Sequence, residues 1–364
     1  MNPYDFVPLP DEVQREAPLM HHRFQQHVGT IRCRLIAVTP IFIPATQAAG
    51  NTQRFIVCQH TGLPVIPGSS LKGVIRSVAE AVSPSCIGLS GELFDNRGNL
   101  DNDYRGKISR DFETCKTATK LCPSCRLFGM VSSQSHFLGK MCIGEARTQK
   151  GQFKVAAQMI LKPLMNPHPD HKAFYLPNNR VAGRKFYFHH LAPKTTIQQT
   201  EHTKTIYPLE GLDAEGKPQT TFEFDVSFSN LMDYEYSILL FALFLTDKMR
   251  HKVGGGKPHG LGTVKIEPIE IRPVDGSQRY KGMARRAQAA TTPDALALTG
   301  EGLKNHIEEA TRLLVLSPSA SLAALKQIWQ YPPATNGNGD SIDYRYPDRT
   351  WFDTNSDKPL SQTP

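Results

Sequence analysis

Four of the seven cysteines in this chain have the spacing of a metal-binding site. Cys122 and Cys125 form a CxxC motif, and Cys115 precedes the motif by seven residues. Thiolates at this spacing can hold a tetrahedral Zn²⁺ ion, and the polar segment around them has too little apolar content to fold without such a staple. We therefore expect a structural zinc site formed by Cys86, Cys115, Cys122 and Cys125. It would perform no chemistry, because four protein ligands leave no open position on the metal.

The fourth ligand and the CxxC motif each have an alternative interpretation. Cys86 is the economical fourth ligand because no histidine occurs between His60 and His136, although His136 or Cys142 could replace it. A redox-active cysteine pair would need a strand-to-helix context, which the following residues 126–129 do not indicate. The presence of a third cysteine at this distance favours zinc over redox chemistry.

A possible anion site lies at the start of a predicted helix, in TGLPVIPGSSLKGVIRSVAEAV at residues 61–82. A proline–glycine turn precedes Ser69 and Ser70, and an amphipathic pattern follows, so either serine is expected to cap the helix. A helix start carries unpaired N–H groups and a partial positive charge, and Lys72 adds a cation there. Such a site would hold a phosphate, although a capped helix with a solvated lysine would give the same pattern.

A glycine-rich basic loop lies far downstream, in VGGGKPHGLG at residues 253–262. Five glycines so close together are costly to order unless the backbone adopts a shape that other residues forbid. The loop is not a nucleotide-binding P-loop, because Pro258 follows Lys257 and the predicted order is helix, loop, strand. With Lys257 and His259 inside it, the loop is suited to an extended anionic backbone lying across it.

A third basic stretch, NNRVAGRKFYFHH at residues 178–190, alternates cations with aromatic side chains. Arg184 and Lys185 could contact phosphates while the aromatic rings stack on unpaired bases. A strand with its rings facing a core and its cations facing solvent would show the same alternation.

The elements that would position these residues follow from hydrophobic periodicity. Strands are predicted at 30–39 and 220–229, a nearly all-apolar helix within 230–249, and a last strand at 263–271. With the helix at 69–82, the order is strand, helix, strands, strand, helix, strand. This order is the ferredoxin-like, α+β arrangement of RNA-recognition folds.

Composition limits the class of protein. The chain has 364 residues and a formal net charge of +8, which favours a polyanionic partner. It has no apolar run of about 18 residues, and its N-terminus has no secretory or transit signal, so we expect a cytoplasmic protein without a membrane partner. An odd number of cysteines in a chain this long favours reduced thiols over a disulfide framework.

Three phrases in this order, IPGSSLKGVIR, CPSCRLFG and GGGKPHGLG, resemble the RAMP superfamily of CRISPR-associated proteins, in particular the backbone subunits of type III effector complexes. GRKFYFHH at residues 183–190 is similar to a phrase of the fused type III-E effectors. The resemblance extends over residues 30–272. It implies a ferredoxin-like (RRM-like) domain that binds guide RNA (crRNA) without sequence preference, with complementary target RNA and other effector subunits as partners.

The residue patterns and the resemblance together predict a domain organisation and a set of RNA contacts. Residues 1–29 would be an irregular N-terminal arm, 30–273 the RNA-binding domain, and 274–364 a helical and irregular extension. Within the domain, 83–129 would be a zinc-binding insertion and 144–200 a thumb-like hairpin insertion. The expected RNA-binding residues are Ser69, Ser70, Lys72, Arg76, Arg184, Lys185, Gly254, Gly255, Gly256, Lys257 and His259.

Catalysis is not expected from this sequence. Cleavage-competent backbone subunits of the family carry an aspartate in the loop after the first strand, where this chain has Asn51 or Thr52. Neither side chain can act as a base or bind a metal as a carboxylate does. An RNA endonuclease with a displaced centre is the alternative, and a solvated loop is the simpler interpretation of its candidate acids, which are Asp95, Asp101, Asp103 and Asp111.

Overall fold

The computed structural model describes residues 2–21, 25–45, 51–87, 108–133, 135–162, 176–190, 203–274, 297–317 and 319–335, and residues 342, 344, 346, 351, 354 and 355. Among the acids of the displaced-centre alternative, Asp95, Asp101 and Asp103 lie outside these residues. None of the helices in the described ranges combines the length and hydrophobicity that a bilayer crossing requires.

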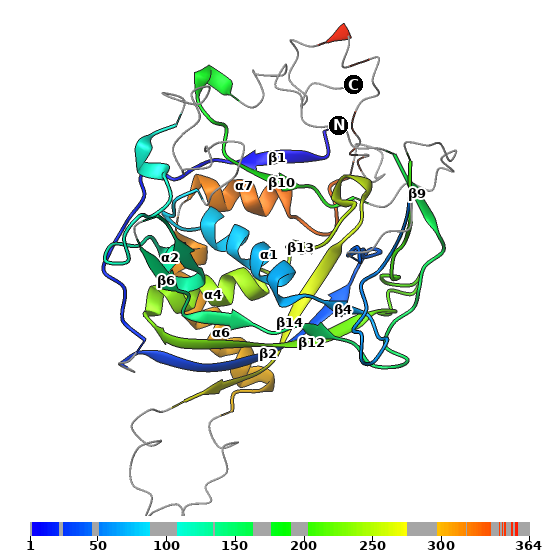
Figure 1. Cartoon of the computed structure of the whole chain (residues 1–364), viewed down its shortest axis with the longest axis horizontal. Helices are drawn as coiled ribbons and strands as arrows, with labels where there is room; N and C mark the ends of the chain where they lie inside the picture. The colour runs from blue at the N-terminus through cyan, green and yellow to red at the C-terminus, as the bar shows by residue number, and fades with distance from the viewer. Residues whose placement is uncertain are drawn as a thin grey trace, which may run out of the picture.

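A curved antiparallel sheet forms one layer of the molecule (Figure 1). β2 (His27–Ala37) lies between β14 (Thr263–Pro273) and β12 (Thr221–Leu231). Alternate residues of β2 are buried, as the apolar alternation of 30–39 predicted. Shorter strands extend the sheet at its two sides: β13 (His251–Lys252) beyond β14, and β7 (Met141–Ile143), β8 (Ala146–Arg147) and β4 (Val65–Ile66) beyond β12.

Two helices connect the long strands and lie on the same side of the sheet (Figure 1). α1 (Gly68–Ala81) follows β2 and β4, and α4 (Asp233–Phe244) joins β12 to β14. The order β14-β2-β12-β8 therefore places the fourth, first, third and second strands of a β-α-β-β-α-β unit side by side. This arrangement fits the ferredoxin-like fold that the sequence predicts.

α4 is apolar on almost every face because other elements cover it on several sides. α1, β12 and β14 contact it from the core, and α6 (Gly300–Leu316) packs against it from the C-terminal extension. α6 buries Leu303, Ile307 and Leu314 in the same core. The extension is thus part of the main hydrophobic core over these residues.

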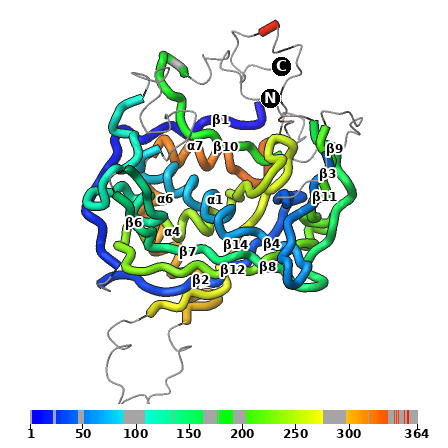
Figure 2. Tube along the Cα trace, viewed as in Figure 1, coloured from blue at the N-terminus to red at the C-terminus, as the bar shows by residue number. Residues whose placement is uncertain are grey.

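The N-terminal residues contain a strand, although the sequence predicted an irregular arm. β1 (Tyr4–Val7) pairs antiparallel with β10 (Arg184–Tyr187), and α7 (Ala320–Ile328) packs against β1. These three elements, blue, green and orange in Figure 2, lie together at one end of the molecule. The strand was missed because its partner is distant in sequence and four residues carry little periodicity.

A separate three-stranded sheet lies at one edge of the molecule (Figure 2). β11 (Lys204–Tyr207) pairs parallel with β3 (Thr52–Arg54) and antiparallel with β9 (Met159–Leu161). The described parts of 144–200 are thus divided among three sheets, with a short 3₁₀ turn at Pro177–Asn179. Residues 163–175 and 191–200 lie outside the described residues, and the thumb-like hairpin stays a prediction.

The cysteine-rich segment forms a small layer beside α1. It contains a 3₁₀ turn at Arg110–Phe112, the short helix α2 (Pro123–Phe128), and the hairpin of β5 (Gly129–Val131) and β6 (His136–Leu138). α2 contacts both α1 and α4, so this layer is attached directly to the main helices.

Candidate nucleic-acid interface and cysteine site

The start of α1 and the glycine-rich loop open onto one groove of about 490 Å³. Ser69, Ser70, Gly73 and Ser77 line it from one face of α1. Three lysines line it from other elements: Lys185 on β10, Lys252 on β13, and Lys257 in the 3₁₀ turn Lys257–His259. We call it the lysine groove. Two segments far apart in sequence therefore contribute to a single concave surface.

Among the described residues, no acid compensates the charge of the lysine groove. No acidic residue lines it, and neither Lys252 nor Lys257 forms an ion pair within the described part of the chain. Lys252 is 2% exposed, and its Nζ donates to the Leu261 carbonyl at 3.1 Å. Burial, and to a lesser extent the charge of Lys257, lowers the pKa of Lys252 to about 7. Burial also lowers the pKa of Lys257. Cations held this way favour an anionic ligand.

Lys185 is exposed and held against aromatic rings. Its Nζ lies 3.7 Å from the centroid of the Tyr4 ring and 5.1 Å from that of Tyr187. Tyr187 and the buried Phe186 also line the groove. The groove thus combines cations with an aromatic wall, as in sites for single-stranded nucleic acid.

The start of α1 differs from the serine-capped helix that the sequence predicted. The N-cap is Pro67, which has no side-chain acceptor, and Ser69 and Ser70 are already inside the first turn. The helix begins this early because Gly68 packs on β7, where an added Cβ would lie 2.3 Å from the Ile143 carbonyl oxygen. In the described structure no acceptor contacts the backbone N–H of Gly68 or Ser69. The helix start therefore keeps two free donors, and Ser69, which carries one of them, lines the groove.

The glycines of the loop are needed mainly for close packing. Gly254 has a φ of 83°, and a Cβ there would lie 2.2 Å from the Phe42 carbonyl oxygen. Gly255 donates its N–H to that same carbonyl at 2.8 Å, so this donor is not free for a ligand, contrary to expectation. Of the three consecutive glycines predicted to contact RNA, Gly254 lines the groove and Gly255 and Gly256 do not.

The four predicted cysteine ligands lie together, and all four are buried. Their Sγ atoms fall within 4.8 Å of one another, and Cys86 Sγ is 3.6 Å from Cys125 Sγ and 3.5 Å from Cys122 Sγ. A tetrahedral zinc site with Zn–S bonds of 2.3 Å places its sulfurs about 3.8 Å apart, so the spacing and the donor set fit that metal. The hydrogen bonds that neighbouring thiols donate lower the pKa of Cys115.

The alternatives for the fourth ligand lie elsewhere. His136 is on β6 and Cys142 on β7, and both are exposed and outside the cluster. The cysteines form a small core of their own with Leu121, Met130 and Phe137. A core of this size needs a bound metal ion or another cross-link to stay folded.

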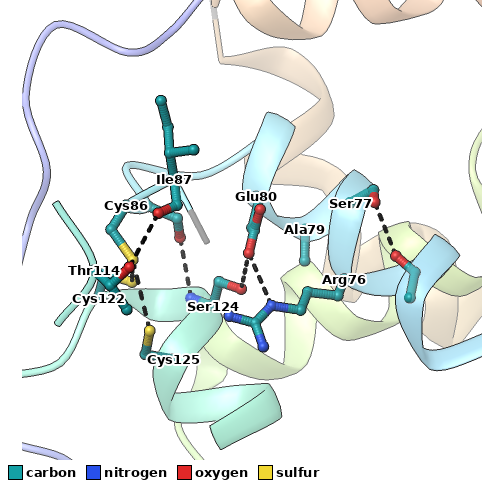
Figure 3. A network of polar contacts seen from close by, with 12 residues as sticks. Arg76, Ser77, Ala79, Glu80, Cys86, Ile87, Thr114, Cys122, Ser124 and Cys125 are labelled. Carbon is teal, nitrogen blue, oxygen red and sulfur yellow. Dashed lines mark hydrogen bonds and ion pairs between the residues drawn. The ribbon is translucent and has the colours of Figure 1, made fainter. Parts of the chain in front are cut away.

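The side chain of Glu80 connects the cysteine site to α1 (Figure 3). Glu80 is 8% exposed and accepts from Arg76 Nε at 2.8 Å and from Ser124 Oγ at 3.3 Å. Ser124 is inside the CxxC motif. Arg184 on β10 donates to Glu80 at 3.0 Å and to the carbonyls of Ser85 and Cys86 at 3.1 and 2.9 Å. We call Arg76, Glu80, Ser124 and Arg184 the Glu80 network.

The model of the RAMP superfamily matches residues 34–265, more than half of the chain. The chain belongs to the RAMP superfamily. RAMP proteins are associated with CRISPR RNA-binding complexes. The matched range contains α1, the cysteine site and the glycine-rich loop, whereas β1, α6 and α7 lie outside it. Comparison with curated proteins gave no match.

Not all the residues predicted to contact RNA face the lysine groove of this RAMP protein. Arg76 and Arg184 are bound to Glu80, and Arg184 has only 11% of its side chain exposed. Lys72 and His259 do not line the groove, and burial lowers the pKa of His259. The sequence does not reveal the pairing of Arg184, because Glu80 is distant along the chain. The pairing of Arg76 could have been predicted, because Glu80 follows it by four residues in the same helix.

Several groove residues were not predicted from the sequence. Gly73 and Ser77 follow Ser69 at intervals of four, a helical spacing that could have placed them on one face. Lys252 directly precedes the glycine-rich loop, and this position could have indicated that it belongs to the same anion site. Trp329, which follows α7, also lines the groove, and nothing in its local sequence indicates this.

The structure gives no carboxylate centre in the described ranges of this RAMP protein. Thr52 begins β3 and Asn51 is exposed beside it. Asp111 is exposed and its carboxylate accepts from Ser109. Within those ranges the four cysteines are the only group of three or more potential ligands at metal-binding distance.

Proposed function

We propose that this RAMP protein is a guide-RNA-binding backbone subunit of a type III-like effector complex, and that the lysine groove holds the phosphate backbone of the RNA. The observation that carries the proposal is the convergence of Lys185, Lys252 and Lys257 with the free donors of the α1 start, without an acid among them. Such a site neutralises phosphates and ignores base identity, as a variable guide requires. Target RNA, other effector subunits and a cytoplasmic location belong to the same proposal.

The cysteine site would hold a structural Zn²⁺ ion through Cys86, Cys115, Cys122 and Cys125. The ion would supply a rigid tetrahedral anchor and no catalysis, because four thiolates fill its coordination sphere. These residues would keep α2 and the β5–β6 hairpin folded beside α1.

The test measures binding of a labelled single-stranded RNA to the purified protein at several salt concentrations. Affinity should fall steeply as salt rises, and Lys257→Gln should reduce the slope of log K against log salt by about one. Lys150→Gln removes an exposed charge that does not line the groove and serves as the matched control. Equal slopes for both variants would place the RNA away from the lysine groove, whereas an absence of salt-dependent RNA affinity would favour a scaffold that binds only proteins.

The endonuclease alternative is tested in the same samples. Guide and target RNA are incubated with the protein, with and without divalent metal, and the strands are separated by size. Intact strands support a binding subunit. Scission that one substitution between 95 and 111 abolishes would establish an enzyme.

A further inference from the structure

Three elements meet at one buried carboxylate, that of Glu80. α1 supplies Glu80 itself together with Arg76, β10 supplies Arg184, and the CxxC turn supplies Ser124. Two of these elements are walls of the lysine groove. α1 lines it with the face that contains Ser69 and Ser77, and β10 lines it with Lys185, the residue after Arg184.

The cysteine site is attached to the same point by a second set of hydrogen bonds. Arg184 donates to the carbonyls of Ser85 and Cys86, and Cys86 is one of the four clustered thiols. The backbone N–H of Ser124 donates to Ser85 Oγ at 3.0 Å. The backbone around two of the cysteine ligands is therefore bonded to the residues that set the distance between α1 and β10.

We infer that Glu80 is a positioning residue through which metal binding at the cysteine site and RNA binding in the lysine groove strengthen each other. The inference rests on the proposed function of the groove. When the four thiols are held by one ion, the backbone at Ser85–Cys86 and at Ser124 is fixed. Glu80 and Arg184 then hold α1 and β10, the two walls of the groove, at a fixed distance from each other. Without the ion these segments lose their anchor, and the groove must be ordered by the RNA itself, which lowers affinity.

A coupling of this kind is reciprocal. If bound metal raises RNA affinity by a given factor, bound RNA must raise metal affinity by the same factor. A metal that merely stabilised its own small core would change protein stability without changing the affinity of the folded groove. A factor clearly above one, measured from either side, therefore separates coupling from a local structural role.

The experiment uses the full chain and compares wild type with Glu80→Gln. Glu80→Gln keeps the size of the side chain but removes the charge that binds both arginines. RNA affinity is measured on Zn²⁺-loaded and metal-stripped protein, and Zn²⁺ affinity is measured by chelator competition with and without RNA. Wild type should lose about tenfold in RNA affinity on stripping, and RNA should raise Zn²⁺ affinity by a similar factor. In Glu80→Gln both factors should fall to near one while Zn²⁺ still binds stoichiometrically.

Arg184→Lys is the second variant, used if Glu80→Gln does not fold. It keeps a positive charge but cannot bridge Glu80 and the two carbonyls at once, so it should also reduce the coupling. Glu215→Gln, at an exposed turn, is the matched control and should keep wild-type coupling. A coupling near one in wild type, or full coupling in both Glu80→Gln and Arg184→Lys, would overturn the inference. The Lys257→Gln salt slope tests the proposed function independently, because it needs no change of metal.

Discussion

Two groups of described basic residues differ in their partners. In the lysine groove, Lys252 and Lys257 face one another's charge without a carboxylate among the described residues. Beside the cysteine site, Arg76 and Arg184 share Glu80, and their guanidinium groups are held by hydrogen bonds. Basic side chains that contribute to the fold are paired with acids, whereas those left unpaired and desolvated are suited to an external anion. Pairing therefore separates structural cations from ligand-binding cations more sharply than charge alone does.

The largest effect is expected from breaking a paired site. Glu235 on α4 is fully buried and binds Arg126 of α2, with Nε to Oε1 at 2.6 Å, as well as Lys140. Glu235→Gln would leave the buried Lys140 without its described charge partner and Arg126 with only the exposed carboxylate of Glu16. We expect it to lower the free energy of unfolding by about 4 kcal/mol. Chemical denaturation measures this change.

Glu223→Gln is the matched control for Glu235→Gln. Glu223 binds Arg32 and Arg34 on the outer face of the sheet, where both arginines are about half exposed. Its loss should cost no more than about 1 kcal/mol. Equal losses for the two variants would contradict the view that burial makes the pairs around α2 structural.

The next effect tests the unpaired group. Replacing Lys252 and Lys257 together by glutamine should weaken RNA binding by about 100-fold at low salt, because two phosphate contacts are lost. Stability should not fall, since removing desolvated cations relieves a cost of folding. RNA titration and thermal unfolding of the same variant measure both. A variant that binds RNA normally, or that is strongly destabilised, would place these lysines in the structural group.

The contrast between the two groups also explains how far the sequence could be interpreted. Hydrophobic periodicity predicted β2, α1, α4 and β14, and cysteine spacing predicted which thiols lie together. The sequence pattern could not show whether Arg184 binds RNA or Glu80. The same alternation of cations and aromatic residues occurs in both cases, and Glu80 is over a hundred residues away. The expected serine cap was wrong for a similar reason, because the packing of Gly68 against Ile143 is a tertiary contact.

A smaller effect is expected from pH. The pKa of Lys252 is lowered to about 7, so the side chain gains a proton as pH falls through neutrality. Between about pH 8 and about pH 6, RNA affinity should therefore rise by up to about tenfold, and Lys252→Gln should abolish this dependence. Burial lowers the pKa of both nearby histidines, His251 and His189. The pKa of His251 falls to about 4, so this side chain stays neutral over the range.

Stability should respond to pH with the opposite sign. Because the folded-state pKa of Lys252 lies below its unfolded value, the unfolded chain binds more protons between these two values. The free energy of unfolding should thus rise with pH from about 7 to about 10, while RNA affinity falls. Denaturation across this range, compared between wild type and Lys252→Gln, measures the difference. Parallel pH profiles for the two proteins would mean that Lys252 is charged throughout.

The smallest stability effect gives the sharpest test of where the ligand lies. Gly73 is inside α1 and lines the lysine groove, and a Cβ added there would meet no atom within 4 Å. Gly73→Ala should raise the free energy of unfolding by about 0.5–1 kcal/mol, because alanine favours helix over glycine. Gly73→Phe points a large ring into the same open space, so the fold should tolerate it while the groove is filled. RNA titration should then show near-normal binding for Gly73→Ala and a severe loss for Gly73→Phe. Normal binding by a folded Gly73→Phe protein would show that the RNA binds another surface, although the lysines of the groove have no acidic partner among the described residues.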